Sequence, residues 1–538
     1  MKSGQLFLLS LLTALLLAFG WFPNGFVPLL FIAFVPLLMV EQQISKHPQK
    51  YHSLTLFACT YSAFLVWNIL TTWWIKNASF GGAIMAITCN ALLMTITFMM
   101  FHKVKKRIGN RWQHILFIGF WITFEFLHHD WDLTWTWLTL GNAFADTPSW
   151  IQWYEYTGVF GGSFWVLFTN SFVFTVVAQN QNLSSSVVVD SIKKNGLKFI
   201  ACIALPIIVS YSISTINTKF DKFANVVIVQ PNIDPYNEKF VLDYEQQLNK
   251  MLQLAAQKID AETDYVIFPE TALTESIWEN QINQSSSIHI LKQFLKAYPR
   301  LKIVVGASTS KMFEQGEALS ATARKFSRQE GYYDAYNAAI QLDTTGFIQL
   351  YHKSRLVPGV EKMPFPFIFK YLGDFAIDLG GTAGSLGTQD ERSVFVSDNE
   401  GFSVAPVICY ESVYGEFVSE YIKNGASFIA IITNDGWWGD TPGYRQHLKY
   451  GTLRAIETRK YIARSANTGI SCIITPKGDI EQATPWWQPA VIKAKIGVSN
   501  QQTFYVKYGD YIGRFAMYLS FGLIIYSWIL LLRKRIKS

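Results

Sequence analysis

The chain has 538 residues, of which 50% are hydrophobic and only 16% are charged, compared with about a quarter charged in ordinary globular domains. Its net charge of +7 is unevenly placed: residues 217–508 hold 29 Lys and Arg against 31 Asp and Glu, whereas the rest holds 17 against 8. The basic excess therefore belongs to the apolar part, where Lys and Arg set membrane topology. This composition indicates a membrane protein with an extramembrane domain and gives no support for nucleic-acid binding.

Eight apolar segments are long enough, or nearly so, to cross a bilayer, which takes about 17–25 helical residues. The first, QLFLLSLLTALLLAFG, also fits the hydrophobic region of a signal peptide. The next segment follows almost at once and no small-residue cleavage site stands out, so we expect a retained helix. The segments lie near residues 5–22, 25–40, 54–75, 81–101, 113–129, 158–179, 198–215 and 510–532.

Lys and Arg alternate between the connections of these segments. They gather after the second, fourth and sixth segments and at the C-terminus, whereas connections 23–25 and 130–157 have none. By the positive-inside rule both termini are cytoplasmic, and the long stretch between the last two segments lies on the opposite side. We expect transmembrane helices in residues 1–217, an extramembrane domain in 218–505, and a last helix with a basic tail in 506–538.

Two features of the apolar part are functional candidates. The connection 130–157 is rich in Trp and Tyr, which is typical of an aromatic belt at the membrane surface, although an arm that contacts substrate has the same composition. Glu125 is costly within hydrocarbon and is a candidate by that reason alone. It also lies near the end of its segment, where a hydrated structural role is equally consistent.

Residues 224–500 alternate short β-branched and apolar runs with segments of helical spacing. Continuous apolar strands are typical of sheets buried on both faces, so the pattern predicts a layered α/β domain. We expect helices over 242–259 and 445–464, and a loop over 379–388. Strands are expected within residues 225–233, 264–271, 301–309, 337–343, 402–411, 427–435 and 469–480.

Polar residues stand where several of these strands end. Glu270 follows DYVIFP, Cys409 follows VAPVI, Asn434 follows FIAIIT, and Lys353 follows the strand-like FIQLYH. Sites in layered α/β domains collect at strand ends, so these side chains are expected to converge. The Lys353 ammonium would favour the Cys409 thiolate, and the Glu270 carboxylate, in a partly apolar pocket, can accept the thiol proton. The same ammonium, together with the backbone N–H after Cys409, can stabilise an oxyanion.

Each candidate also has a simpler explanation. Isolated Glu and Lys are usually solvated, and Glu361 is equally consistent with a loop charge. Cys409 shares an outer-side domain with Cys472, where a disulfide is plausible, although Cys472 lies in the apolar run GISCII and is typical of a core thiol. No His/Cys cluster has the spacing of a metal site, and His447 stands isolated.

Five motifs together resemble one known superfamily. IFPET (267–271), YHKSRLVPGVE (351–361) and VICYES (407–412), followed by NDGWWGD (434–440) and RQHL (445–448), resemble the carbon–nitrogen hydrolase (nitrilase) superfamily, and within it the apolipoprotein N-acyltransferase family. The resemblance covers essentially the whole chain. It implies about eight transmembrane helices and a nitrilase-like αββα sandwich on the periplasmic side of a bacterial inner membrane.

The resemblance also implies a role for each matching residue. It makes Glu270 the general base, Lys353 the stabiliser of thiolate and oxyanion, Cys409 the nucleophile and Glu361 a further essential glutamate. Supporting or substrate-binding roles fall to Tyr410 and Glu411, which flank the nucleophile, to Trp437 near the path of the acyl chain, to Asn434, and to Phe240, which stands where the family has a Trp.

The implied reaction is a ping-pong acyl transfer. Cys409 takes an acyl chain from a membrane phospholipid as a thioester, and the α-amine of an N-terminal diacylglyceryl-cysteine of a lipoprotein then receives it. The resemblance implies no metal or organic cofactor, and we expect a monomer. Two alternatives remain open: a membrane-anchored amidase or nitrilase acting on a lipid-like amide, with water as acceptor, and a non-catalytic lipid-handling scaffold.

Overall fold

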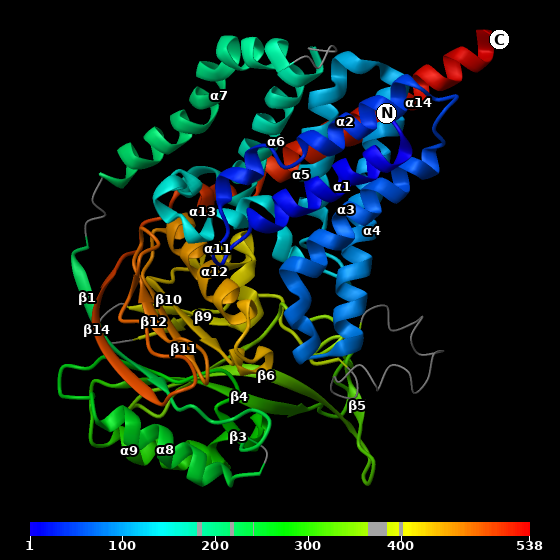
Figure 1. The fold of residues 1–538 in the computed structure, drawn as a ribbon. Helices are drawn as coiled ribbons and strands as arrows, with labels where there is room; N and C mark the ends of the chain where they lie inside the picture. The colour runs from blue at the N-terminus through cyan, green and yellow to red at the C-terminus, as the bar shows by residue number, and fades with distance from the viewer. Residues whose placement is uncertain (180–184, 216–219, 240, 364–384, 398–401, 538) are drawn as a thin grey trace. The chain divides into compact units, whose positions relative to one another are not determined.

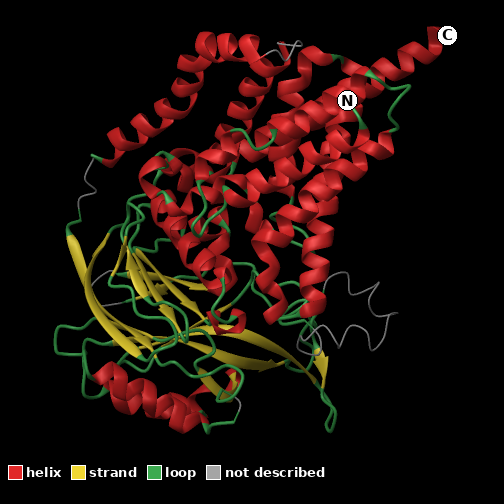
Figure 2. Cartoon of the chain, in the orientation of Figure 1, coloured by secondary structure: helices red, strands yellow, loops and turns green. Residues whose placement is uncertain are grey.

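The computed structural model describes residues 1–179, 185–215, 220–239, 241–363, 385–397 and 402–537, with side chains left undescribed between 179 and 194 (Figure 1). The chain divides into two compact units. One consists of Met1–Lys76, Gly81–Ile216 and Asp510–Ser538, and is helical; the other consists of Asn77–Phe80 and Asn217–Gly509, and holds all the strands described (Figure 2).

Each of the eight apolar segments predicted from the sequence is helical in the structure. The second is a 3-10 turn, Val27–Phe31, followed by an α-helix. The helices of this unit are α1 Ser3–Phe19, α2 Val35–Lys46, α3 Ser53–Thr72, α4 Phe80–Ile108, α5 Gln113–Leu127, α6 Tyr154–Gln179, α7 Ser185–Ser214 and α14 Tyr511–Lys537.

Six helical stretches within the described residues are long and apolar enough to cross a membrane, judged by length and composition. Helix α1, with 17 residues, and α5, with 15, are shorter. A total of eight spans therefore stays a prediction. The six stretches are Val27–Lys46, Ser53–Asn77, Phe80–Ile108, Tyr154–Ala178, Asn195–Ser214 and Tyr511–Ile536.

The aromatic connection between α5 and α6 folds into the helical unit. Residues 136–145 are all buried, and Trp137 packs on Trp74 with ring centroids 5.1 Å apart. Glu125, at the end of α5, accepts hydrogen bonds from the indole of Trp121 (3.0 Å) and the backbone N–H of Leu140 (2.8 Å). The geometry gives Glu125 a structural task, since it ties the middle of this buried stretch, at Leu140, to α5.

Two sheets form the core of the second unit. In the described part of the chain the larger sheet has eight strands in the order β14-β1-β2-β4-β6-β5, with β3 paired to β4 and β7 to β6; the smaller has six in the order β13-β12-β11-β10-β9-β8. Strands β1, β2 and β4 run parallel, as do β9, β10 and β11. The larger sheet contains β1 Lys222–Gln230, β2 Tyr265–Ile267, β3 Leu273–Trp278, β4 Lys302–Met312, β5 Arg324–Lys325, β6 Tyr332–Leu342, β7 Ile348–His352 and β14 Ala490–Val498; the smaller contains β8 Phe395–Val396, β9 Ser403–Ile408, β10 Phe428–Thr433, β11 Ile462–Ala466, β12 Cys472–Ile474 and β13 Ile480–Glu481.

The sheets face one another between two layers of helices (Figure 1). Between the sheets, the Ser465 hydroxyl donates to the Val229 carbonyl (2.8 Å), and Tyr265 and Phe428 pack with centroids 5.3 Å apart. Apolar side chains of α8 and α9 join the larger sheet in one buried cluster. The outer helices are α8 Tyr244–Ala256 and α9 Ser286–Leu295 on the larger sheet, and α11 Gly415–Lys423 and α12 Pro442–Thr458 on the smaller. The predicted αββα sandwich is thus observed.

The helix predicted over residues 445–464 is partly wrong. Helix α12 begins after Thr441, whose hydroxyl caps Gly443 N–H (3.3 Å), and ends at Arg459, which has a left-handed backbone with φ +52°. Residues 462–466 then form β11, which pairs in parallel with β10. The predicted loop over 379–388 lies largely outside the described residues, and its described part, 385–388, has no regular secondary structure.

Candidate active site

Four predicted site residues lie at the ends of central strands. Lys353, Cys409 and Asn434 directly follow β7, β9 and β10, and Glu270 lies three residues beyond the end of β2. Glu270, Lys353 and Asn434 are buried, and Cys409 is half-buried. Because β2 and β7 belong to one sheet and β9 and β10 to the other, the site is formed where the facing sheets present their strand ends.

The Lys353 ammonium lies between two carboxylates. Its Nζ is 2.9 Å from Glu270 Oε1 and 2.8 Å from Glu361 Oε1. Asn337, on β6, donates from Nδ2 to the same two oxygens, at 2.8 and 3.2 Å. Asn337 also fixes the lysine backbone, since its carbonyl accepts the Lys353 N–H at 2.8 Å. The structure therefore brings Glu270, Lys353 and Glu361 together and adds Asn337, which the sequence did not single out.

The Lys353 ammonium and the carboxylates on either side of it stabilise each other in a largely buried place. Burial alone would raise the pKa of Glu270, but the charge and hydrogen bond of Lys353 outweigh it and lower that pKa. Burial likewise disfavours the charge of Lys353, yet Glu270 and Glu361 raise the pKa of the ammonium well above its ordinary value. At neutral pH the pair is Glu270 carboxylate and Lys353 ammonium.

The second oxygen of Glu270 is held from the other sheet. Glu270 Oε2 accepts the backbone N–H of Asn434 at 3.1 Å. Nearby, buried Lys239 donates to the Thr271 hydroxyl, and burial lowers its pKa to about 8 despite the attraction of Glu270. Asn434 thus positions the Glu270 carboxylate through its backbone, and Lys239 adds a second buried cation beside Glu270.

Cys409 occupies a strained turn. Its φ is +50°, a left-handed conformation that residues other than glycine rarely adopt and that is common at functional sites. The Cys409 carbonyl accepts the Ser412 hydroxyl (2.7 Å) and lies 3.1 Å from His447 Nε2. This turn projects the side chain from the end of β9 while its backbone stays fixed.

The surroundings of Cys409 favour the protonated thiol, because they raise its pKa. Burial raises its pKa, the carboxylate of Glu270 raises it further, and only Lys353 acts strongly in the opposite direction. Cys409 and Cys472 are both free, and Cys472 is buried in β12. The structure thus contains no Cys409–Cys472 disulfide, and the thiol is available beside a carboxylate and an ammonium.

Glu411 ties together the segments that carry Lys353 and Cys409. Its Oε1 accepts the Tyr351 hydroxyl and the Ser354 N–H, both at 2.7 Å, while Oε2 accepts the Ile408 N–H at 2.8 Å. Burial raises the pKa of Glu411, and these hydrogen bonds oppose the rise. Tyr410 is buried beside it and packs edge-on against Tyr414 at 5.3 Å. The structure places both residues beside Cys409, and the supporting roles that the family resemblance implies for them stay a prediction.

A chain of buried polar groups runs from α12 to Cys409. His447 Nδ1 is 2.9 Å from Asp435 Oδ1, and Arg464 donates to Asp435 Oδ2 at 2.6 Å. Burial opposes the negative charge of Asp435, but Arg464 and His447 hold its pKa well below the usual range. His447, which looked isolated in the sequence, therefore connects a buried ion pair to the Cys409 carbonyl.

Trp437 and Phe240 were the predicted aromatic neighbours of the site. Trp437 is partly exposed; its carbonyl accepts the Tyr236 hydroxyl at 2.6 Å, and the two rings lie 5.3 Å apart. Phe240 lies outside the described residues. From the same segment of chain, Tyr236 is the aromatic residue that the structure places against Trp437.

Comparison with known proteins decides the family. Residues 225–504 match the carbon–nitrogen hydrolase family model, and residues 13–172 match that of the apolipoprotein N-acyltransferase N-terminal domain. An apolipoprotein N-acyltransferase of Chlorobaculum tepidum is 30% identical over 520 residues, which cover 94% of this chain and 93% of that protein. The chain belongs to the apolipoprotein N-acyltransferase family.

A second relative agrees with this assignment. The apolipoprotein N-acyltransferase of Geobacter metallireducens is 26% identical over 526 residues, covering 94% of this chain and 92% of that one. Among solved structures, Saccharomyces cerevisiae Nit3, a member of the nitrilase superfamily, is 14% identical with a TM-score of 0.38, covering 52% of this chain and 93% of its own. Membership in the apolipoprotein N-acyltransferase family makes the chain an acyltransferase within the carbon–nitrogen hydrolase superfamily.

Proposed function

We propose that this protein transfers a fatty acyl chain from a membrane phospholipid, through a thioester on Cys409, to the α-amine of an N-terminal diacylglyceryl-cysteine of lipoproteins. One observation carries the proposal. The Lys353 ammonium is held at 2.9 and 2.8 Å by Glu270 and Glu361, and its charge acts on the Cys409 thiol together with that of Glu270. This arrangement, in a chain of the matching family, supports the roles of Cys409 as nucleophile, Glu270 as base and Lys353 as stabilising cation.

The first half-reaction forms the thioester. Because the pKa of the Cys409 thiol is raised and Glu270 is ionised, we infer that the thiol proton passes to Glu270 as the sulfur attacks the ester carbonyl. The Lys353 ammonium and the backbone N–H of Tyr410 stabilise the oxyanion. The intermediate then collapses: the C–O bond breaks, the leaving oxygen takes the proton from Glu270, and a lysophospholipid departs.

The second half-reaction moves the acyl chain to the amine. The neutral α-amine attacks the thioester carbonyl, and Glu270 accepts the amine proton. Collapse breaks the C–S bond, and the departing sulfur is reprotonated by Glu270. The products are an amide and the free thiol, so the enzyme returns to its starting state with no net change in protons or electrons.

The helical unit supports the proposed lipid substrates and cell compartment. Its apolar helices support a membrane location, and the distribution of Lys and Arg supports cytoplasmic termini with residues 218–505 on the periplasmic side of a bacterial inner membrane. Both substrates are then anchored in the bilayer that holds the enzyme. We expect the protein to be a monomer.

The acceptor is tested with the full-length protein in phospholipid vesicles. A synthetic peptide that begins with S-diacylglyceryl-cysteine is added, and peptide and lipid products are measured by mass spectrometry. We expect peptide with one added acyl amide and an equal amount of lysophospholipid. The control peptide carries an acetylated α-amine and should receive no acyl chain. Release of free fatty acid with no acylated peptide would contradict the proposal and favour a hydrolase.

A further inference from the structure

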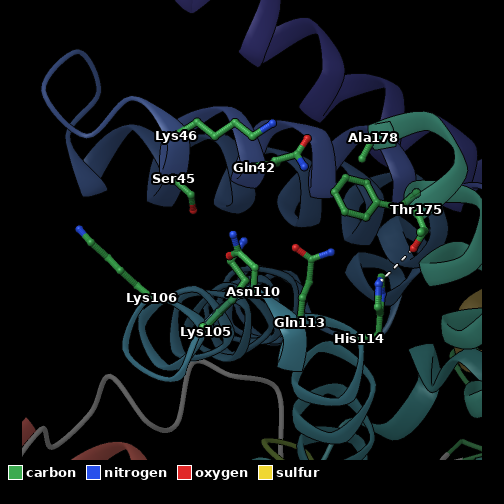
Figure 3. Close-up of a pocket in the computed structure, with 12 residues that line it drawn as sticks. Gln42, Ser45, Lys46, Lys105, Lys106, Asn110, Gln113, His114, Thr175 and Ala178 are labelled. Atoms are coloured by element: carbon green, nitrogen blue, oxygen red, sulfur yellow. Dashed lines mark hydrogen bonds between the residues drawn. The ribbon is translucent and has the colours of Figure 1, made fainter. Parts of the chain in front are cut away.

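A polar cavity lies within the helical unit, outside the candidate active site. It has a volume of about 850 Å³, which lies in the range of small-molecule sites, about 300–1,000 Å³. The C-terminal ends of α2, α4 and α6 and the first turn of α5 form its walls (Figure 3). Nothing in the proposed acyl transfer uses this cavity.

The cavity carries a net positive charge. Buried Lys105 is neutralised by an ion pair with Glu41, which also binds His102 Nδ1 at 2.7 Å. Lys46 and Lys106 also line the cavity, and both are exposed. In the described part of the chain neither makes an ion pair, and no Asp or Glu is among the lining residues described. Two cationic groups therefore remain for a ligand.

Amide groups add hydrogen-bond donors to these cations. Gln42, Asn110 and Gln113 line the cavity, and no hydrogen bond of their side chains occurs among the described residues. Figure 3 shows the amides of Gln42 and Gln113 approaching from facing walls, on α2 and α5. Ammonium and amide N–H groups around one space suit a phosphate group, whose oxygens accept several charge-assisted hydrogen bonds.

The position of the cavity along the helices indicates which kind of phosphate-containing molecule fits it. In α4 the apolar stretch gives way at HKVKKRI (102–108), and in α2 at EQQISK (41–46), so the cavity lies where membrane helices meet the headgroup layer. Basic pockets between helix ends on the cytoplasmic side take anionic lipid headgroups. Lysines at helix ends also compensate helix dipoles, but that role needs neither a cavity nor amide donors around it.

We propose that this cavity binds the phosphate headgroup of an anionic phospholipid of the surrounding membrane, with phosphatidylglycerol as the probe that tests it. Lys46 and Lys106 supply the attraction, and Gln42, Asn110 and Gln113 supply the donors. The site would give the protein a lipid ligand separate from its acyl donor.

The test measures phospholipid binding to the full-length protein in detergent by native mass spectrometry. Every variant also carries Cys409→Ala, so that no acyl chain is transferred during the titration. Phosphatidylglycerol should bind more tightly than phosphatidylethanolamine with the same acyl chains. Lys46→Gln with Lys106→Gln should weaken phosphatidylglycerol binding about thirtyfold, as expected for two lysines near a membrane surface. Lys103→Gln with Lys534→Gln removes the same charge from exposed positions outside the cavity and should change binding less than about twofold.

A second variant tests the cavity rather than its charge. Ala178, on α6, lines the cavity, so Ala178→Trp fills the space and leaves every lysine in place. We expect it to weaken phosphatidylglycerol binding as strongly as the lysine variant. Unchanged binding in Ala178→Trp, or an equal loss in both double lysine variants, would overturn the proposal. Binding of sn-glycerol 3-phosphate with the affinity of the lipid would also overturn it, since the ligand would then be a free phosphate.

Discussion

Glu361 holds the Lys353 ammonium in place. It holds Nζ at 2.8 Å with Oε1 and accepts the Val357 N–H with Oε2 at 2.9 Å. We predict that Glu361→Gln slows thioester formation on the order of a hundredfold, because the neutral amide leaves the ammonium drawn to Glu270 and out of place for the oxyanion. Single-turnover rates measure the effect. Glu317→Gln is the matched control, since it removes an exposed carboxylate that lies 2.7 Å from Lys311. This control should leave the rate of thioester formation unchanged. Equal rates for the two variants would show that Glu361 does not position the ammonium.

His447 acts on Cys409 through the backbone. Its Nε2 lies 3.1 Å from the Cys409 carbonyl, in a residue whose φ is +50°. We predict that His447→Leu lowers kcat for thioester formation on the order of tenfold, the effect of one lost hydrogen bond, and leaves KM for phospholipid unchanged. His447→Gln retains an N–H donor near Nε2 and should recover most of the rate.

The matched control for that prediction is His289→Leu, at an exposed position on α9 bonded to Gln293. It should match the wild-type rate. If His447→Leu raised KM alone, or if His447→Gln were no faster than His447→Leu, positioning through the Cys409 carbonyl would be refuted.

At the scale of elements, Glu411 joins strands of different sheets. Its carboxylate accepts hydrogen bonds from the Tyr351 hydroxyl in β7 and from the Ser354 N–H just after β7. It also accepts the N–H of Ile408, the last residue of β9. Glu411→Ala leaves these buried donors without an acceptor, at about 1–3 kcal/mol for each unsatisfied group. We predict a loss of about 3 kcal/mol in unfolding free energy, measured by denaturant unfolding. Glu420→Ala, exposed on α11, should stay within about 0.5 kcal/mol; a loss as small for Glu411→Ala would contradict the bridging role.

The strands that the sequence predicted well are those with continuous apolar runs. Strands β1, β4, β9 and β10 are buried on both faces, and burial of that kind leaves a local signal. Strand β11 was assigned to a helix because the apolar spacing of α12 continues past Arg459 with no glycine to end it. Strand β3 was missed, since LTESIW interrupts its apolar residues with polar ones.

The residues of the candidate site also fall into those that the sequence predicted and those that it did not. Glu270, Lys353, Cys409 and Asn434 were predictable because each follows an apolar strand, and their roles came from a family resemblance. Asn337 and His447 lie within β6 and α12; RQHL (445–448) contributed to the family resemblance, but neither residue follows an apolar strand and neither was assigned a role. Their importance depends on which distant residues they meet, Glu361 or Cys409, and only the tertiary fold determines those partners.

At the scale of the whole molecule, the placement of Lys and Arg predicts the topology. Residues after Lys50 and after Lys106 should lie in the cytoplasm, as should the C-terminus, with residue 315 on the other side. We predict that alkaline phosphatase, which is active only outside the cytoplasm, is active when fused after Gln315 and inactive after Lys50 or Lys106. A C-terminal green fluorescent protein should fluoresce in the same cells. Active phosphatase at Lys50 or Lys106 would reverse the predicted orientation.

The thioester on Cys409 is the central claim, and intact-mass measurement of the protein given phospholipid without acceptor tests it most directly. Wild-type protein and Cys472→Ala, which removes a buried free thiol in β12, should each gain the mass of one acyl chain, and hydroxylamine should remove it. Cys409→Ala should gain nothing. An acyl adduct that persists in Cys409→Ala, or wild-type protein that N-acylates the peptide without ever carrying an acyl chain, would contradict the account.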